Sequence, residues 1–277
     1  MPQYDEMIEQ LRQGVSAERA RVVLFDFDGT ISLIRSGWME EMVPMMVDLL
    51  LEAKTGESEE ELRVIVREFV GKLTGKQTVY QMIELADQIR ARGREPLEPL
   101  VYKTMYLDRL HEKIKDRLDA LESGRVSKER YMVPGARALL EALRARGLKL
   151  YLASGTDHPY MSREADLLDV SRYFDGGVFG ARDDFKSFSK KILVERVIAR
   201  SECRGEEFLG FGDGYVEIEN VKEVGGVAVG VATDEPDCLR VDEWKRKRLA
   251  AVGADFIVPH FGCHDELMSA LFPGNAQ

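Results

Sequence analysis

Strand-like and helix-like segments alternate along the second half of the chain, and this alternation constrains the fold more than any other feature. A helical pattern over residues 136–147 precedes the apolar run LKLYLA at 148–153. The same alternation continues to the strand-like run ADFIV at 254–258. Strands joined by helices of this length run parallel, with helices on both faces. The sequence therefore predicts an α/β fold with a doubly wound parallel sheet.

The first strand of this sheet is expected in the segment VVLFDFDGT, residues 22–30. Its apolar β-branched run ends in Asp26 and Asp28, which would point the same way in an extended chain and repel each other. Such a pair is stable when a cation lies between the carboxylates or when one of them holds a proton. Gly29 lets the chain turn sharply behind the pair. The segment predicts a metal-dependent reaction centre.

A block without strand patterns separates this segment from the alternating part. Between about residues 36 and 122 the apolar residues follow helical periodicity in four stripes, separated by turns rich in glycine or proline. We expect an all-helical insertion over residues 32–131, and a core built from residues 1–31 and 132–277. Apolar residues at helical spacing also predict a short helix over residues 4–13, before the first strand.

Composition and charge exclude several classes of protein. The chain has 277 residues and a net charge of −10, which argues against nucleic acid or an anionic membrane as the main partner. Cys203, Cys238 and Cys263 are widely spaced and odd in number, as is typical of free thiols in a reducing compartment. No apolar run approaches a membrane span, and the N-terminus lacks the apolar core of a secretory leader. We expect a cytoplasmic protein.

Polar groups follow four predicted elements that should meet at one edge of the sheet. They are Asp26 and Asp28, the turn Ser154-Gly155-Thr156, the run Ser189-Lys190-Lys191, and Asp213 with Glu217 four residues later. Phosphoryl transfer through a carboxyl phosphate needs such parts. A carboxylate attacks phosphorus, a second acid moves the proton, a hydroxyl and a lysine bind the phosphoryl oxygens, and Mg²⁺ on hard oxygens offsets the repulsion.

These segments resemble the four motifs of the haloacid dehalogenase superfamily, in DFDGT, LASGT, the SKK lysine and GFGDGYVE. The helical insertion resembles the cap that some members carry between the first and second motifs. The resemblance implies a Rossmann-like core in which Asp26 is the nucleophile and Asp28 the general acid/base. Ser154 and Gly155 would bind the phosphoryl group. Asp26, the carbonyl of Asp28 and Asp213 would bind Mg²⁺.

Two positions in this resemblance stay open. Glu217 stands where the family usually has aspartate, so it is either a metal ligand or a neighbour of one. Lys190 and Lys191 are adjacent, and no following proline marks the active-site lysine; we favour Lys190.

The resemblance also implies what the insertion does. A glycine-bracketed loop at residues 71–78 would reach over the site, where Lys76 and Gln77 would select the leaving group. A cap of this size suggests a small phosphorylated metabolite, such as a sugar phosphate or a phosphoglycolate-like acid, in a monomer or homodimer.

Rival functions differ in a few residues. A phosphomutase of the same superfamily remains open, whereas a dehalogenase would need neither Asp28 nor Mg²⁺. A phosphonatase would need a Schiff-base lysine in the cap, for which Lys76 is a weak candidate. A phosphoacceptor signalling module is shorter and accepts phosphate after its third strand, whereas Asp26 follows the first.

Overall fold

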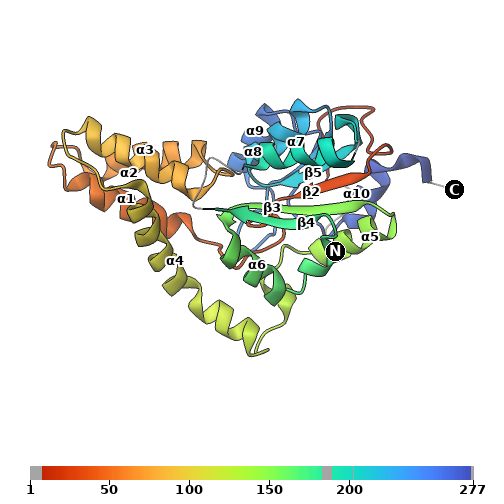
Figure 1. The fold of residues 1–277 in the computed structure, drawn as a ribbon, viewed down its shortest axis with the longest axis horizontal. Helices are drawn as coiled ribbons and strands as arrows, with labels where there is room; N and C mark the ends of the chain where they lie inside the picture. Colours follow the sequence, from red (N-terminus) through yellow and green to blue (C-terminus); the bar gives the residue numbers. More distant parts are fainter. Residues whose placement is uncertain (1–7, 183–188, 202, 276–277) are drawn as a thin grey trace.

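The computed structural model describes residues 8–182, 189–201 and 203–275. Within these ranges the chain forms one seven-stranded sheet and ten α-helices (Figure 1). The strands are β1 (Glu9–Gln10), β2 (Val22–Phe25), β3 (Lys149–Asp157), β4 (Gly177–Ala181), β5 (Phe208–Gly212), β6 (Val227–Val231) and β7 (Phe256–Val258). The helices are α1 (Met39–Leu51), α2 (Glu59–Lys72), α3 (Thr78–Ala91), α4 (Pro99–Glu122), α5 (Ala136–Ala145), α6 (His158–Leu167), α7 (Lys190–Ser201), α8 (Tyr215–Glu223), α9 (Glu243–Ala251) and α10 (His264–Leu271).

The strand order places β2 at the centre of the sheet. The order is β1-β7-β6-β5-β2-β3-β4, and every neighbouring pair is parallel except β1 and β7. From β2 the chain builds outward through β3 and β4 on one side, then through β5, β6 and β7 on the other. Such a reversal opens a crevice at the carboxyl end of the central strand. The predicted doubly wound parallel sheet is confirmed, with one antiparallel edge strand added.

The central strands are apolar along their whole length because helices cover both faces. Every residue of β2, β5 and β6 is buried, as is typical of parallel strands between two helical layers. In the register of β2, Phe25 pairs with Leu152 of β3 and with Phe211 of β5. The residues that follow these three positions therefore meet at the same edge.

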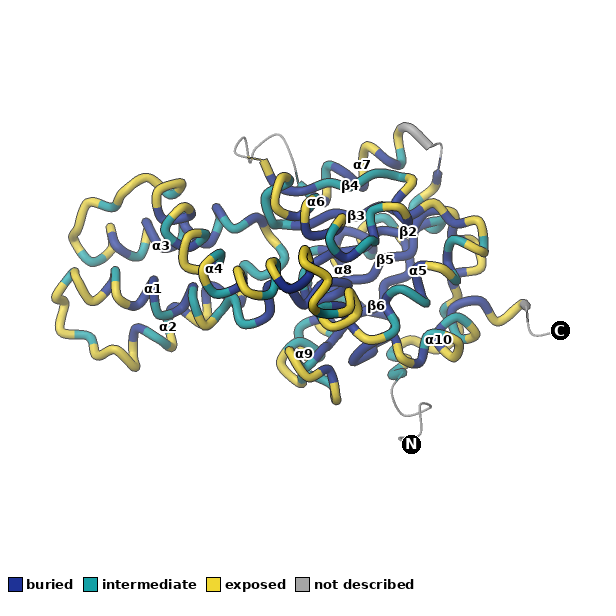
Figure 2. Tube along the Cα trace, turned by 90° about the horizontal axis from the view of Figure 1, so that it is seen from below, coloured by how far each residue is buried: buried dark blue, intermediate teal, exposed yellow. Residues whose placement is uncertain are grey.

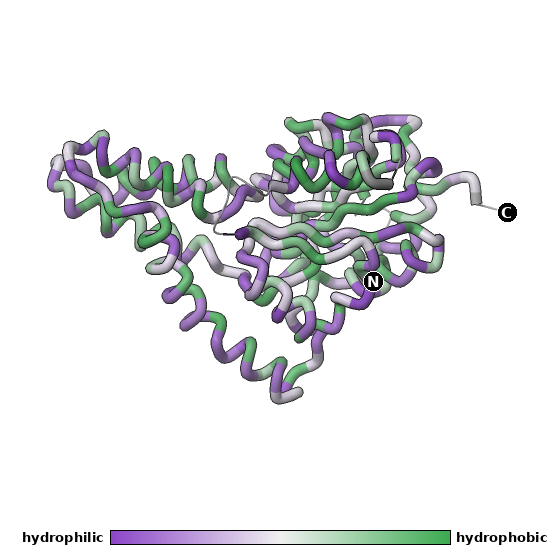
Figure 3. Tube along the Cα trace, in the orientation of Figure 1, coloured by the Kyte–Doolittle hydropathy of each residue, from purple (hydrophilic) through white to green (hydrophobic). Residues whose placement is uncertain are grey.

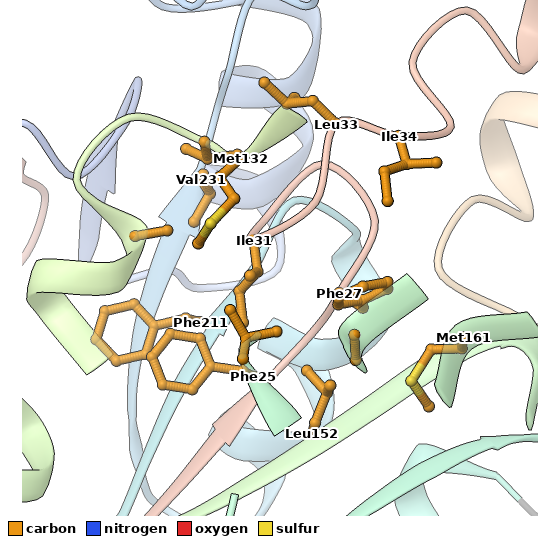
Figure 4. Close-up of a cluster of buried hydrophobic side chains, with 14 of the residues drawn as sticks. Phe25, Phe27, Ile31, Leu33, Ile34, Met132, Leu152, Met161, Phe211 and Val231 are labelled. Carbon is orange, nitrogen blue, oxygen red and sulfur yellow. The ribbon is translucent and has the colours of Figure 1, made fainter. Parts of the chain in front are cut away.

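Two buried clusters occupy the two faces of the sheet. One lies beneath α5, α6 and α10, and the other beneath α7, α8 and α9 (Figure 1). In the first cluster the rings of Phe25 and Phe211 stack with centroids 4.6 Å apart, and Phe27 and Ile31 pack at the same strand end (Figure 4). Phe27 is fully buried. The turn after β2 therefore has an apolar anchor between its two aspartates.

Helices α1 to α4 lie between β2 and α5 in the sequence and extend away from the sheet (Figure 1). Figure 2 shows the buried sides of α1, α2 and α3 turned toward one another and the exposed residues on the outer turns. Met42, Met45 and Met46 of α1 are fully buried there. Hydrophilic and hydrophobic residues alternate along α4 (Figure 3), which runs from this group back toward α6. No helix in the described ranges has the length and apolar character needed to cross a bilayer.

Three local predictions need correction, and one helix was not predicted. Ser154, Gly155 and Thr156, expected as the turn after a strand, belong to β3. Residues 9–10 form the edge strand β1, paired antiparallel with β7, so the helix expected over residues 4–13 is wrong for the described part; residues 4–7 lie outside it. Helix α9 was not predicted, because Leu249 is its one fully buried residue and it shows no apolar stripe. Gly71 and Lys72 belong to α2, which shortens the predicted loop of residues 71–78.

Candidate active site

The turn after β2 presents Asp26 and Asp28 at the carboxyl edge of the sheet. The amides of Ile31 and Ser32 both donate to the carbonyl of Phe27, which closes the turn. Gly29 has a φ of 74°, a left-handed conformation that favours glycine. A side chain at Gly29 would also collide with the carboxylate of Asp213. The glycine therefore lets two separate acidic segments approach each other.

The loop after β5 is fixed to this turn through backbone groups. The amide of Asp213 donates to Oγ1 of Thr30 over 3.0 Å, and the amide of Asp26 donates to the carbonyl of Phe211 over 2.9 Å. Asp26 and Asp213 therefore occupy the same crevice. The resemblance assigns both of them to the metal.

Hydroxyl groups at the end of β3 orient Asp28. The hydroxyl of Ser154 donates to Oδ2 of Asp28 over 3.1 Å, and that of Thr156 donates to the same oxygen over 2.9 Å. The amide of Thr156 in turn donates to Oγ of Ser154. Oδ1 of Asp28 is buried and has no hydrogen-bond partner among the described residues. One carboxylate oxygen is thus held, and the other is available for chemistry.

The adjacent lysines at the start of α7 have different surroundings. Lys190 is buried, and its ammonium group lies 2.7 Å from Oδ1 of Asp26 and also contacts Glu217. Lys191 is exposed and pairs with Glu223 over 2.8 Å. The structure therefore brings Lys190 to the two acids and leaves Lys191 on the surface. Oε2 of Glu217 is buried without a hydrogen-bond partner among the described residues.

Lys245 of α9 lies between two further carboxylates. Its ammonium group is 3.0 Å from Oδ2 of Asp213 and 2.7 Å from Oε1 of Glu235. Burial lowers the pKa of Lys245, but the Asp213 and Glu235 carboxylates outweigh it and raise the pKa above its usual value. Lys245 is therefore a permanent cation inside the site.

Arg35, in the segment between β2 and α1, also lies between an aspartate and a glutamate. Its guanidinium group forms a forked pair with Glu164 of α6, with Nη2 to Oε1 at 2.6 Å and Nε to Oε2 at 3.0 Å. The same Nε lies 3.9 Å from Oδ1 of Asp28. Arg35 and Glu164 are both buried, so their pairing offsets much of the cost of removing two charges from water.

These contacts share one pattern. Each of the three aspartates has its own basic neighbour, and each basic residue also contacts a glutamate. The three groups are Asp26–Lys190–Glu217, Asp28–Arg35–Glu164 and Asp213–Lys245–Glu235. Each group carries one excess negative charge when all its members are ionised. The three groups together are therefore anionic, although they contain three cations.

The donor set suits a hard divalent cation such as Mg²⁺, which prefers oxygen ligands and would offset this excess charge. Two observations bear on the fit. The Asp28 and Glu217 carboxylates each keep one buried oxygen without a hydrogen-bond partner among the described residues. Within the same residues, no three His, Cys, Asp or Glu side chains form a metal-holding group by themselves. The resemblance assigns the third protein ligand to a backbone carbonyl, which agrees with that absence.

Burial raises the pKa of Asp26 to about 7, against the lowering effect of the Lys190 ammonium group. The Asp213 and Asp28 carboxylates act in the same direction as burial. Asp26 therefore lies in a site where its negative charge is costly unless cations surround it.

The loop between α2 and α3, residues 73–77, which we call the cap loop, lies against the core at this crevice. A Cβ on Gly155 would lie 2.6 Å from the carbonyl oxygen of Lys76, and a Cβ on Gly214 would lie 3.0 Å from Cα of Gly75. Backbone therefore meets backbone at both places. The cavity that this loop lines measures about 90 Å³.

The cavity collects most of the predicted residues and several that were not predicted. Asp26, Asp28, Lys76, Ser154, Gly155, Lys190 and Asp213 line it, together with Arg35, Trp38, Met42, Thr74, Gly75, Thr78, Gln81, Tyr106 and Thr156. Glu217 lies behind Lys190, and Gln77 is buried at the start of α3 without lining the cavity. A lone arginine in the apolar run ISLIRSGW could have indicated Arg35. No pattern in the hydrophilic α9 indicated Lys245.

Comparison with known proteins gives a family match over most of the chain. Residues 20–225 match the haloacid dehalogenase-like hydrolase family. The phosphoglycolate phosphatase of Escherichia coli (strain K12) is 27% identical over 222 residues, which cover 77% of this chain and 82% of that protein.

Solved structures share the fold at low identity. A phosphonoacetaldehyde hydrolase-like protein from Oleispira antarctica superposes with a TM-score of 0.61 at 13% identity, covering 96% of this chain and 99% of that one. A β-phosphoglucomutase from Clostridium difficile gives 0.59 at 13%, covering 92% and 97%. A predicted phosphoglycolate phosphatase from Haemophilus somnus 129PT gives 0.57 at 14%, covering 90% and 98%.

Proposed function

Because the chain belongs to the haloacid dehalogenase-like hydrolase family, we propose that it is a Mg²⁺-dependent phosphatase that hydrolyses a small phosphorylated metabolite through an aspartyl phosphate. The observation that carries the proposal is the pairing of Asp26 with Lys190 in a cavity that Asp28 also lines. The 27% identity to a phosphoglycolate phosphatase supports the same reaction class. A phosphorylated carboxylic acid or sugar phosphate is the proposed kind of substrate.

In the first step, a carboxylate oxygen of Asp26 attacks phosphorus, and the bond from phosphorus to the leaving oxygen breaks. Asp28 donates its proton to that oxygen, so the product leaves as an alcohol. The hydroxyls of Ser154 and Thr156 hold Oδ2 of Asp28. Oδ1 lacks such a partner among the described residues and lies 3.9 Å from Nε of Arg35.

In the second step, Asp28 accepts a proton from water as the water oxygen bonds to phosphorus. The bond between phosphorus and Asp26 breaks, inorganic phosphate leaves, and both aspartates return to their starting states. Lys190, 2.7 Å from Asp26, stabilises the charge that spreads over the phosphoryl oxygens in both steps. Its contact with Glu217 keeps the ammonium group aimed at Asp26.

Asp26, Asp213 and the carbonyl of Asp28 are the proposed Mg²⁺ ligands. Glu217 is proposed as a neighbour of these ligands, because it contacts Lys190, which in turn contacts Asp26. When bound, Mg²⁺ would cancel part of the negative charge on the phosphate and the carboxylates.

Residues 32–131 are the proposed cap, and residues 1–31 and 132–277 the proposed catalytic core. The contact between Gly155 and the Lys76 carbonyl supports a cap that closes directly over the phosphoryl site. The cavity of about 90 Å³ favours a compact substrate over a phosphoprotein. Lys76 lines this cavity and Gln77 adjoins it, so both are proposed to contact the leaving group. Three buried free thiols support a location in the cytoplasm.

The test is a screen of phosphorylated metabolites with the wild-type protein and the Asp26→Asn variant, with and without Mg²⁺. We expect phosphate release by the wild type to require Mg²⁺ and to stop on chelation. Asp26→Asn should lose turnover while keeping its circular dichroism spectrum. Turnover that persists in this variant would overturn the proposed nucleophile, and turnover that persists after chelation would overturn the metal requirement.

A further inference from the structure

The carboxylates of Asp213 and Glu235 both lie close to Gly29. Only Asp213 belongs to a motif identified in the sequence. A Cβ on Gly29 would collide with Oδ2 of Asp213 and would lie 3.0 Å from Oε1 of Glu235. The carbonyl of Asp28, a proposed metal ligand, immediately precedes this glycine in the chain. Glu235 is therefore close enough to the proposed metal site to compete for a place in it.

Lys245 occupies the space between these two carboxylates. Its ammonium group contacts Oδ2 of Asp213 at 3.0 Å and Oε1 of Glu235 at 2.7 Å, and its side chain is 13% exposed. The other oxygen of Glu235 accepts a hydrogen bond of 2.8 Å from the hydroxyl of Ser36. Both oxygens of Glu235 are thus engaged by protein groups, whereas Lys245 contacts just one oxygen of Asp213.

We propose that Lys245 is a positioning residue that keeps the Glu235 carboxylate out of the metal site and thereby makes the site selective for Mg²⁺ over Ca²⁺. Mg²⁺ requires six ligands in near-ideal octahedral geometry, whereas Ca²⁺ accepts six to eight oxygens in flexible arrangements. A metal site in which Glu235 supplies no oxygen has fewer ligands and suits the smaller ion, Mg²⁺. A site that gains oxygens from Glu235 suits the larger ion, Ca²⁺. The proposal rests on the metal dependence in the proposed function.

The same contacts give Lys245 a role that a purely structural lysine would lack. The ammonium group places a positive charge between two carboxylates, so its removal leaves them facing each other without a cation. Without Lys245, the Glu235 carboxylate keeps only its hydrogen bond from Ser36 and can turn toward the metal site. Removing Lys245 is therefore expected to create a better Ca²⁺ site, while removing Glu235 as well should abolish this gain.

The experiment is calorimetric titration of the whole protein with CaCl₂ and, separately, with MgCl₂, in the absence of substrate. We expect Lys245→Met to bind Ca²⁺ at least tenfold more tightly than the wild type, while its Mg²⁺ affinity rises by no more than about threefold. An equal gain for both ions would leave the selectivity unchanged and overturn the proposal. The double variant Lys245→Met/Glu235→Gln should return to within about threefold of the wild-type Ca²⁺ affinity. Lys247→Met, which changes an exposed lysine on the same helix, is the matched control and should leave both affinities unchanged.

Each outcome decides the proposal. Unchanged Ca²⁺ affinity in Lys245→Met, or equal Ca²⁺ affinity in the single and double variants, overturns it while the wild type still binds Mg²⁺. A wild type that binds neither ion overturns the proposed metal dependence and this inference together. If circular dichroism shows that Lys245→Met does not fold, Lys245→Gln keeps a hydrogen-bond donor without the charge, and the same two criteria apply to it.

Discussion

The hydroxyl of Thr156 donates a hydrogen bond of 2.9 Å to Oδ2 of Asp28, so the end of β3 sets the orientation of the proposed general acid/base. We predict that Thr156→Val lowers kcat by about tenfold, because a hydrogen bond to a charged group contributes roughly 1.5–3 kcal/mol and Ser154 still holds the same oxygen. KM should change little. Steady-state kinetics test this.

Thr156→Ser, which keeps the hydroxyl, is the matched control and should retain most of the activity. A Thr156→Val variant with wild-type kcat would show that Ser154 alone orients Asp28.

The adjacent lysines of α7 form a natural matched pair, because Lys190 contacts Asp26 while Lys191 pairs with Glu223 at the surface. We predict that Lys190→Met lowers kcat by roughly 10²–10³-fold, the usual effect of removing one group that stabilises transition-state charge. Lys191→Met should stay within twofold of wild type. Equal losses in the two variants, measured on folded protein, would refute the assignment of Lys190.

The forked pair between Arg35 and Glu164 is almost completely buried, with side chains 5% and 3% exposed. We predict that Glu164→Ala lowers the free energy of unfolding by about 3–5 kcal/mol, because it leaves the Arg35 guanidinium buried with one partner fewer. Denaturant unfolding measures this. The neighbouring Arg163 pairs with Glu122 at the surface, both more than half exposed, so Arg163→Ala should cost less than about 1 kcal/mol.

Gly155 lies where the loop between α2 and α3 approaches the core. We predict that Gly155→Ala raises KM at least tenfold, because its methyl group would lie 2.6 Å from the Lys76 carbonyl oxygen and would keep the cap from seating. Its melting temperature should stay near that of wild type, since the clash falls between the cap and the core. An unchanged KM would mean that the cap need not close on Gly155 for the substrate to bind.

The fold could be predicted because its determinants are local. The apolar runs of β2, β5 and β6 and the helices between them leave few arrangements other than a parallel sheet. The four helical stripes after residue 36 correspond to α1 to α4. Strand β1 escaped prediction because it has two residues, Glu9 and Gln10, and exists through its pairing with β7.

The sequence could predict the site residues that lie at strand ends, but not Lys245 and Glu164, which reach the site from helices. Asp26 and Asp213 directly follow apolar strands, and Ser154 lies in the last part of β3, so topology alone brings them together. Lys245 reaches Asp213 from α9, which follows β6 in the chain, and Glu164 reaches Arg35 from α6. Such contacts depend on how helices pack over the sheet, which the sequence pattern does not specify. The roles of all these residues remain predictions.

Main-chain atoms lie close together where the loop between α2 and α3 meets the core, at Gly155 with Lys76 and at Gly214 with Gly75. A seat made of backbone does not depend on which side chains the loop carries. Substitutions at Lys76 and Gln77 can therefore alter the shape and charge offered to a leaving group while the lid still shuts. In evolutionary terms, the residues that select the substrate are separate from the backbone contacts that close the cap. Selection can therefore change the substrate without preventing closure.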